Sequence, residues 1–74
     1  MTKSELNEMA LNGEFEDGPR RFSFEGVITE VFDDGFSPGL LAVEIWHGER
    51  LGNECYVDSY PDGEFVPVDD DATN

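Results

Sequence analysis

The stretch Phe22-Ser-Phe-Glu-Gly-Val-Ile-Thr-Glu-Val-Phe32 restricts the fold of this chain more than any other feature. Aromatic and β-branched residues dominate it, and such residues suit the pleated surface of a β-sheet. Gly26 interrupts the run, and a glycine inside a strand commonly marks a bulge or a sharp bend. We therefore expect a long first strand that bends at Gly26.

Three further strands are expected downstream, because short turns rich in Gly, Pro and Asp separate the remaining apolar segments. These strands are predicted over residues 40–47, 53–59 and 64–68. A loop over 33–39 precedes them, a turn over Gly48–Gly52 follows the first of them, and Tyr60-Pro-Asp-Gly63 forms a tight turn. Pro67 cannot donate to a ladder, which places the last strand at a sheet edge.

A short helix is expected before the strands. Thr2-Lys3-Ser4-Glu5 fits a capping box, apolar residues follow at helical spacing, and Asn12-Gly13 suits a helix end. A helix over about residues 3–12 is too short to be stable alone, so it must dock its Leu6/Met9 stripe on the rest of the chain.

The expected fold is α+β: a short N-terminal helix followed by a four- to five-stranded antiparallel meander, with a small SH3- or OB-like barrel as one option. The helix and connector occupy residues 1–20, the strands 21–68, and an acidic disordered tail 69–74. Over 21–68 the pattern is similar in architecture to small five-stranded or SH3-like barrels, including oligonucleotide-binding ones. Those barrels hold their ligand with basic and aromatic residues, and the basic residues are missing here.

Charge is the extreme property of the chain, which carries 18 acidic against 4 basic residues and a net charge of −14. Residues 22–74 contain every acid except five and a single base, Arg50. Such a one-sign field opposes folding through self-repulsion. It also excludes direct nucleic-acid binding through a basic surface, since phosphates are neutralised by Lys and Arg.

No motif points to catalysis, a metal or a cofactor, so we expect a binding protein rather than an enzyme. The one cysteine, Cys55, excludes an intrachain disulfide and is expected to be a buried, inert thiol, and His47 is expected to be a turn residue. Asp33-Asp34 and Asp69-Asp70-Asp71 lack the spacing of an EF-hand loop. With no signal peptide and no long apolar run, a cytoplasmic location is expected.

The predicted partner-binding surface combines aromatics with carboxylates. The aromatics fall where strand parity or a loop predicts exposure: Phe36, Trp46, Tyr56 and Tyr60. The carboxylates share a parity from the third strand into the turn, or extend that field: Glu54, Asp58, Asp62, Glu30, Asp34 and Glu44. Large aromatics among polar residues are typical of protein–protein hot spots. The alternative is that both faces of a curled sheet are covered, with the helix shielding Trp46.

Two functions account for the acidity. In the first, the carboxylates imitate phosphates and occupy a basic site on a nucleic-acid-binding protein, as phage-encoded anti-restriction or anti-CRISPR inhibitors do. Same-face residues stand roughly 6.6 Å apart along a strand, comparable with the charge spacing of B-DNA of about 3.4 Å per strand. In the second, the chain is a halophile-adapted small β-barrel module, since it has one lysine against three arginines and acids on both strand parities. A homodimer is compatible with either, and no membrane partner is expected.

Overall fold

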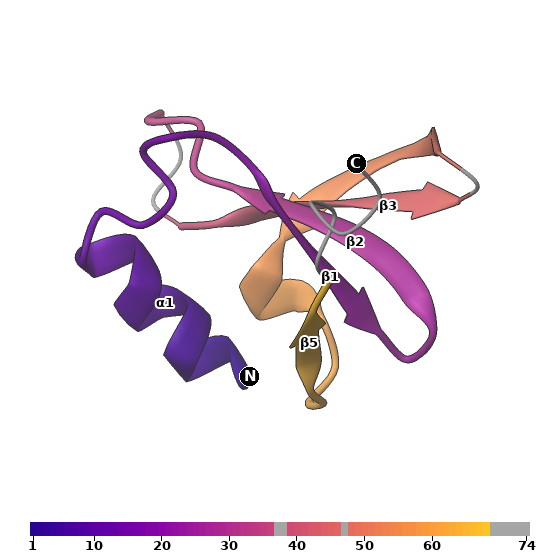
Figure 1. The fold of residues 1–74 in the computed structure, drawn as a ribbon, viewed down its shortest axis with the longest axis horizontal. Coiled ribbons are helices and arrows are strands. Elements are labelled where there is room, and N and C mark those ends of the chain that lie inside the picture. Colours follow the sequence, from indigo (N-terminus) through magenta and orange to yellow (C-terminus); the bar gives the residue numbers. More distant parts are fainter. Residues whose placement is uncertain (37–38, 47, 69–74) are drawn as a thin grey trace.

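The structure is a computed structural model that describes residues 1–36, 39–46 and 48–68. The predictions for His47 and for the tail over 69–74 therefore lie outside the described residues. Along the chain the elements are α1 (Lys3–Leu11), β1 (Arg20–Phe24), β2 (Val27–Phe32), β3 (Leu41–Trp46), β4 (Glu49–Tyr56), the 3-10 helix η1 (Val57–Ser59) and β5 (Phe65–Pro67) (Figure 1). The predicted α+β class, one N-terminal helix before an antiparallel meander, is confirmed.

The five strands form one antiparallel sheet in the order β4-β3-β2-β1-β5. After β4 the chain passes through η1 and crosses to the opposite edge of the sheet, where β5 pairs with β1. Pro67 therefore does lie on an edge strand, as predicted. The hydrogen-bonded order ends at β4 and at β5, so closure into a barrel is not shown for the described strands.

The first predicted strand is two strands, and its prediction as one bent strand is wrong. β1 and β2 form a hairpin in which Phe24 pairs with Val27. The two residues between them both have positive φ, 50° for Glu25 and 83° for Gly26. Two consecutive left-handed residues define the two-residue turn that matches the twist of a hairpin. Asn or Asp ordinarily occupies the first of these positions. Because glutamate stands there in this chain, the sequence did not indicate a turn.

Replacing Gly26 by alanine tests this turn. Gly26→Ala should lower the free energy of unfolding by about 1–2 kcal/mol, because an L-residue is penalised at φ 83°. Urea denaturation followed by the fluorescence of the single tryptophan measures it. Gly39→Ala is the matched control, since Gly39 has no positive φ and a Cβ there meets its nearest atom at 4.0 Å. Equal losses in both variants would contradict the turn assignment.

The β3–β4 hairpin also differs from prediction. Trp46 pairs with Glu49, so the residues predicted as a turn over 48–52 lie mostly within β4. Ile45 pairs with Arg50 but Val43 pairs with Glu54, which leaves two additional residues on β4. Gly52, at φ 85°, lies in this bulge. The predicted strand over 53–59 ends early at Tyr56, where η1 begins and the Val57 N–H donates to the Leu40 carbonyl at 2.9 Å.

The core lies between one face of the sheet and the segments that cover it. Its buried side chains are Leu6, Phe15, Phe22, Phe24, Val31, Leu40, Ala42, Val57 and Phe65. The ring centroids of Phe24 and Phe65 lie 4.6 Å apart. Leu6 is the one buried side chain of α1, and the Met1 ammonium and carbonyl both bond the backbone of Phe65. Helix and last strand are thereby joined across the whole length of the chain.

The opposite face of the sheet is also largely covered in its central strands. Val43 and Ile45 are buried, although they point away from the core. Glu30 lies among them at 8% exposure and pairs with Arg50 and with Arg21, the latter at 3.9 Å. β3 is consequently buried on both sides along most of its length.

The only helix longer than one turn among the described residues, α1, is too short and too polar to cross a bilayer.

Candidate protein-binding groove

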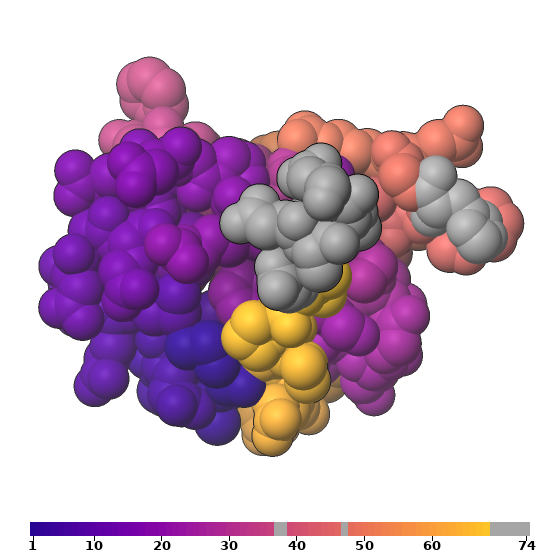
Figure 2. Space-filling view, viewed as in Figure 1, coloured from indigo at the N-terminus to yellow at the C-terminus, as the bar shows by residue number. Residues whose placement is uncertain are grey.

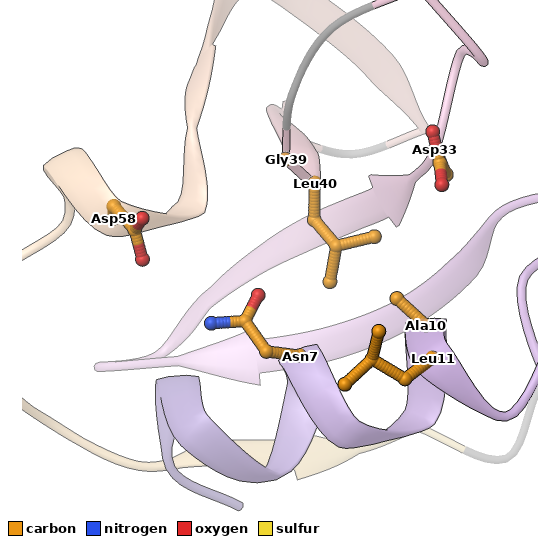
Figure 3. A pocket seen from close by; sticks show the side chains of 7 residues that line it. All are labelled: Asn7, Ala10, Leu11, Asp33, Gly39, Leu40 and Asp58. Atoms are coloured by element: carbon orange, nitrogen blue, oxygen red, sulfur yellow. The ribbon is translucent and has the colours of Figure 1, made fainter.

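A hollow of about 410 Å³ lies between the second half of α1 and the chain that leads into β3 (Figure 3). Asn7, Ala10 and Leu11 line it from the helix, and Leu40 lines it from the opposite side. Figure 3 shows the aspartates Asp33 and Asp58 at its two ends, with the apolar side chains between them. The hollow therefore presents an apolar centre and an anionic group at either end.

Local hydrogen bonds fix the walls of this hollow. Asp33 accepts from the Gly35 N–H at 2.9 Å, and Asp34 accepts from the Phe36 N–H at 2.9 Å. Aspartate commonly stabilises a turn in this way. At the other end, the bond from Val57 to Leu40 holds η1, and hence Asp58, beside the start of β3. The two ends are positioned by backbone contacts.

Two smaller hollows share lining residues with this one. The first, about 200 Å³, shares Ala10 and Asp33 with it and adds Phe15, Glu16 and Gly35. We call these two hollows together the α1 groove; it is bordered by exposed Leu11 and by three carboxylates, Glu16, Asp33 and Asp58. The second smaller hollow, about 230 Å³, shares Gly39 and Asp58 and adds Tyr56 and Ser59, but Tyr56 pairs with Leu41 and so lies on the sheet face away from α1.

All four basic side chains of the protein are engaged in contacts within it. Lys3 donates to the Tyr60 carbonyl at 2.7 Å and lies 3.6 Å from Asp62. Arg20 donates to the Glu14 carbonyl at 3.0 Å, and Arg21 and Arg50 both pair with Glu30. Most carboxylates are exposed instead: Glu5, Glu8, Glu14, Glu16, Asp17, Glu25, Asp33, Glu49, Glu54, Asp58, Asp62 and Glu64. The surface is thus strongly anionic, and its few cations are occupied.

The predicted binding residues fall at opposite ends of the molecule. Asp58 lines the α1 groove, Tyr56 lines the neighbouring hollow on the other sheet face, and Asp34 and Phe36 lie in the loop after β2, where Phe36 is 96% exposed. Trp46, 60% exposed and not shielded by α1, lies at the other end of β3, about 16 Å along the strand. Figure 2 shows the loop after β2 projecting at the upper left and the β3–β4 hairpin at the right. The ten residues therefore do not form one surface.

Several of the ten are placed differently from their prediction. Glu30 is nearly buried and pairs with two arginines, so we leave it out of the proposed surface. Tyr60, which was predicted to be exposed, is half-buried against Phe24 and Phe65.

The shared parity predicted for three carboxylates is also wrong. β4 ends at Tyr56, and η1 breaks the alternation before Asp58 is reached. Glu54 lies on the sheet face away from α1, as its pairing with buried Val43 shows, and Asp62 pairs with Lys3. Glu44 lies on the core face, half-buried. Cys55, expected to be buried, is half-buried.

The sequence prediction missed the helix side of the groove. Leu11 is 86% exposed although it is apolar. Leu11 comes five positions after Leu6, and at 3.6 residues per turn this spacing turns its side chain well away from the buried stripe of the helix. The sequence did indicate Leu11, because an apolar residue outside the docking stripe of a helix is expected to be exposed. For Asp33 the sequence offered no indication beyond its position at the end of a predicted strand.

Comparison with protein-family models, with curated proteins and with solved structures found no match to this chain. Within the described ranges, no three His, Cys, Asp or Glu side chains lie close enough together to hold a metal ion.

Proposed function

We propose that this protein is a small acidic binding protein, not an enzyme, that docks on a basic, nucleic-acid-binding site of a protein partner. In this role it acts as a DNA-mimic-type inhibitor of the anti-restriction or anti-CRISPR class, in the cytoplasm of its host. The observation that supports the proposal is that the basic and the acidic side chains are placed differently. The bases are held by internal contacts, while the carboxylates stay in solvent.

The α1 groove supports this proposal as the primary contact. Interfaces combine an apolar centre with a polar rim, and hot spots cluster in well-packed pockets. Here Leu40, Ala10 and Leu11 form the centre, while Asp33 and Asp58 supply charge that complements a basic partner. Long-range attraction between the net charge of −14 and a cationic site accelerates association at low salt.

Displacement of DNA tests the function. Fluorescein-labelled duplex DNA bound to a purified restriction endonuclease, a CRISPR effector complex or a histone-like protein should be released by this protein from at least one of the three. Circular dichroism should show the protein folded at low salt, and displacement should weaken as salt rises and screening shortens from about 10 Å at 0.1 M to about 3 Å at 1 M. A folded protein that displaces DNA from none of them contradicts the proposal.

The double variant Asp33→Asn/Asp58→Asn should weaken this displacement roughly two- to tenfold, the range expected for losing two exposed charge contacts. Glu8→Gln/Glu64→Gln is the matched control, because it removes the same charge from exposed positions that do not line the groove. If both double variants lose displacement equally, only net charge matters and the groove is not the contact.

A halophile-adapted binding module is the second candidate. The observation that favours it is the spread of exposed carboxylates over the helix, the strands and the turns. In that case the protein folds only when molar salt screens its self-repulsion. The circular-dichroism titration separates the two candidates directly, since a chain unfolded below molar salt cannot inhibit a partner at ordinary ionic strength.

A further inference from the structure

A separate hollow, of about 220 Å³, lies on the core face of the sheet at the end away from the α1 groove. It is lined by Phe24, Glu25, Val27, Thr29, Glu44, Tyr60 and Pro61. Its volume is below the range of about 300–1,000 Å³ that is usual for sites of drug-sized ligands. A hollow of this size suits a single side chain better than a whole metabolite.

The Thr29 hydroxyl is the most informative group in this hollow. The residue is 1% exposed, and its Oγ1 forms no hydrogen bond with any described residue. A buried hydroxyl without a partner costs free energy and calls for an explanation. The Tyr60 hydroxyl is close enough for Thr29 to influence its ionisation, but the geometry does not satisfy Oγ1. An unpaired hydroxyl therefore lies buried beneath the floor of the hollow.

Glu44 supplies a negative charge beside this hydroxyl. It is half-buried on β3, directly opposite Thr29 in the sheet register. The ion pairs seen among the described residues join Lys3 to Asp62 and Arg21 and Arg50 to Glu30, and none of them includes Glu44. Glu25 adds a second, exposed carboxylate at the rim. A half-buried carboxylate without a cation is an incomplete pair, because burial strengthens its attraction for one.

Aromatic rings complete the lining. Phe24 and Tyr60 pack edge to face, with centroids 5.4 Å apart, and both border the hollow. Burial raises the pKa of Tyr60, and nearby Cys55 and Glu44 raise it further against the opposing effect of Thr29. Cations are attracted to the faces of such rings.

We propose that this hollow, bordered by Thr29, Glu44, Tyr60 and Phe24, binds the guanidinium group of an arginine side chain. Arginine matches the lining better than lysine, because its planar fork donates to two acceptors at once and stacks on aromatic surfaces. That this arginine belongs to a basic protein partner rests on the proposed function. The affinity of the hollow for a guanidinium group is independent of that function and can be tested without a partner.

The test is a titration of the ¹⁵N-labelled protein with N-acetyl-arginine amide, followed by amide chemical shifts. We expect a saturable response centred on Thr29, Glu44 and Tyr60. N-acetyl-lysine amide should bind more weakly, and the uncharged N-acetyl-citrulline amide should produce no saturable response. Glu44→Gln should weaken arginine binding about tenfold or more, the loss expected for a charge-assisted hydrogen bond. Glu8→Gln, the control on α1, should leave it unchanged.

A second variant separates a loss of arginine binding from a loss of folding. Thr29→Val keeps the shape of the side chain and removes the unpaired hydroxyl, so it should raise Tm by about 4–8 °C. The same variant should weaken arginine binding, a combination that a purely structural role of Thr29 does not produce. Shifts spread over the whole acidic surface, or losses equal in Glu44→Gln and Glu8→Gln, overturn the proposal. Failure of DNA displacement with arginine binding intact contradicts the proposed function alone.

Discussion

Replacing Phe65 by alanine is expected to remove a large share of the free energy of unfolding of this protein. Phe65 is fully buried and contacts the rings of Phe22, Phe24 and Tyr60. Truncation of a buried Phe costs about 3–5 kcal/mol, whereas a chain of this length is stabilised by only about 4–11 kcal/mol in total. Phe65 also carries the backbone contacts to Met1, so the same change loosens the N-terminus.

Urea denaturation followed by circular dichroism and tryptophan fluorescence measures this loss. Val66→Ala is the control on the same strand, because Val66 is 48% exposed and its truncation should cost less than about 1 kcal/mol. Similar midpoints for the two variants would show that β5 is not part of the cooperative core.

Leu6→Ala should have the second largest effect, a loss of about 2–5 kcal/mol. Leu6 is the one buried side chain of α1, and a helix of nine residues has little stability of its own. Without this anchor the helix should detach, and the α1 groove should lose one wall.

Leu11→Ala provides a control with the same chemical change on the same helix. Leu11 is 86% exposed, so its truncation should leave the midpoint of urea denaturation nearly unchanged. Helical signal at 222 nm should fall in Leu6→Ala before the sheet unfolds, whereas Leu11→Ala should weaken only the DNA displacement that depends on the groove. A large stability loss in Leu11→Ala contradicts the docking of α1 by Leu6.

The order and type of most elements could be predicted because local chemistry dictates them. The capping box formed by Thr2 and Glu5 is present, with the Thr2 N–H donating to the Glu5 carboxylate at 2.9 Å and lowering the pKa of that group. Pro67 confined its strand to an edge. The errors occurred where backbone conformation overrode residue type: Glu25 adopts a left-handed conformation, and the Gly52 bulge keeps β4 extended through a predicted turn.

The candidate site was less predictable, because it depends on which segments meet. Strand parity cannot predict the position of Asp58, because this residue lies on a 3-10 helix. Nor can it predict that Asp33 and Asp58 line the same hollow. Parity also treated Glu30 as a surface carboxylate, whereas two arginines, one from each flanking part of the sheet, cover it. Long-range contacts of this kind leave no mark in a local pattern.

The bulge in β4 has a consequence for how copies of this protein meet one another. β4 is an outer strand, eight residues long, and an exposed strand of that length offers its free backbone groups to another sheet. The two additional residues around Gly52 interrupt that row, so a second copy cannot continue the ladder in register. At low salt, mutual repulsion keeps the molecules apart. When ions remove that repulsion, the irregular outline of this strand remains as the barrier against fibre-like association.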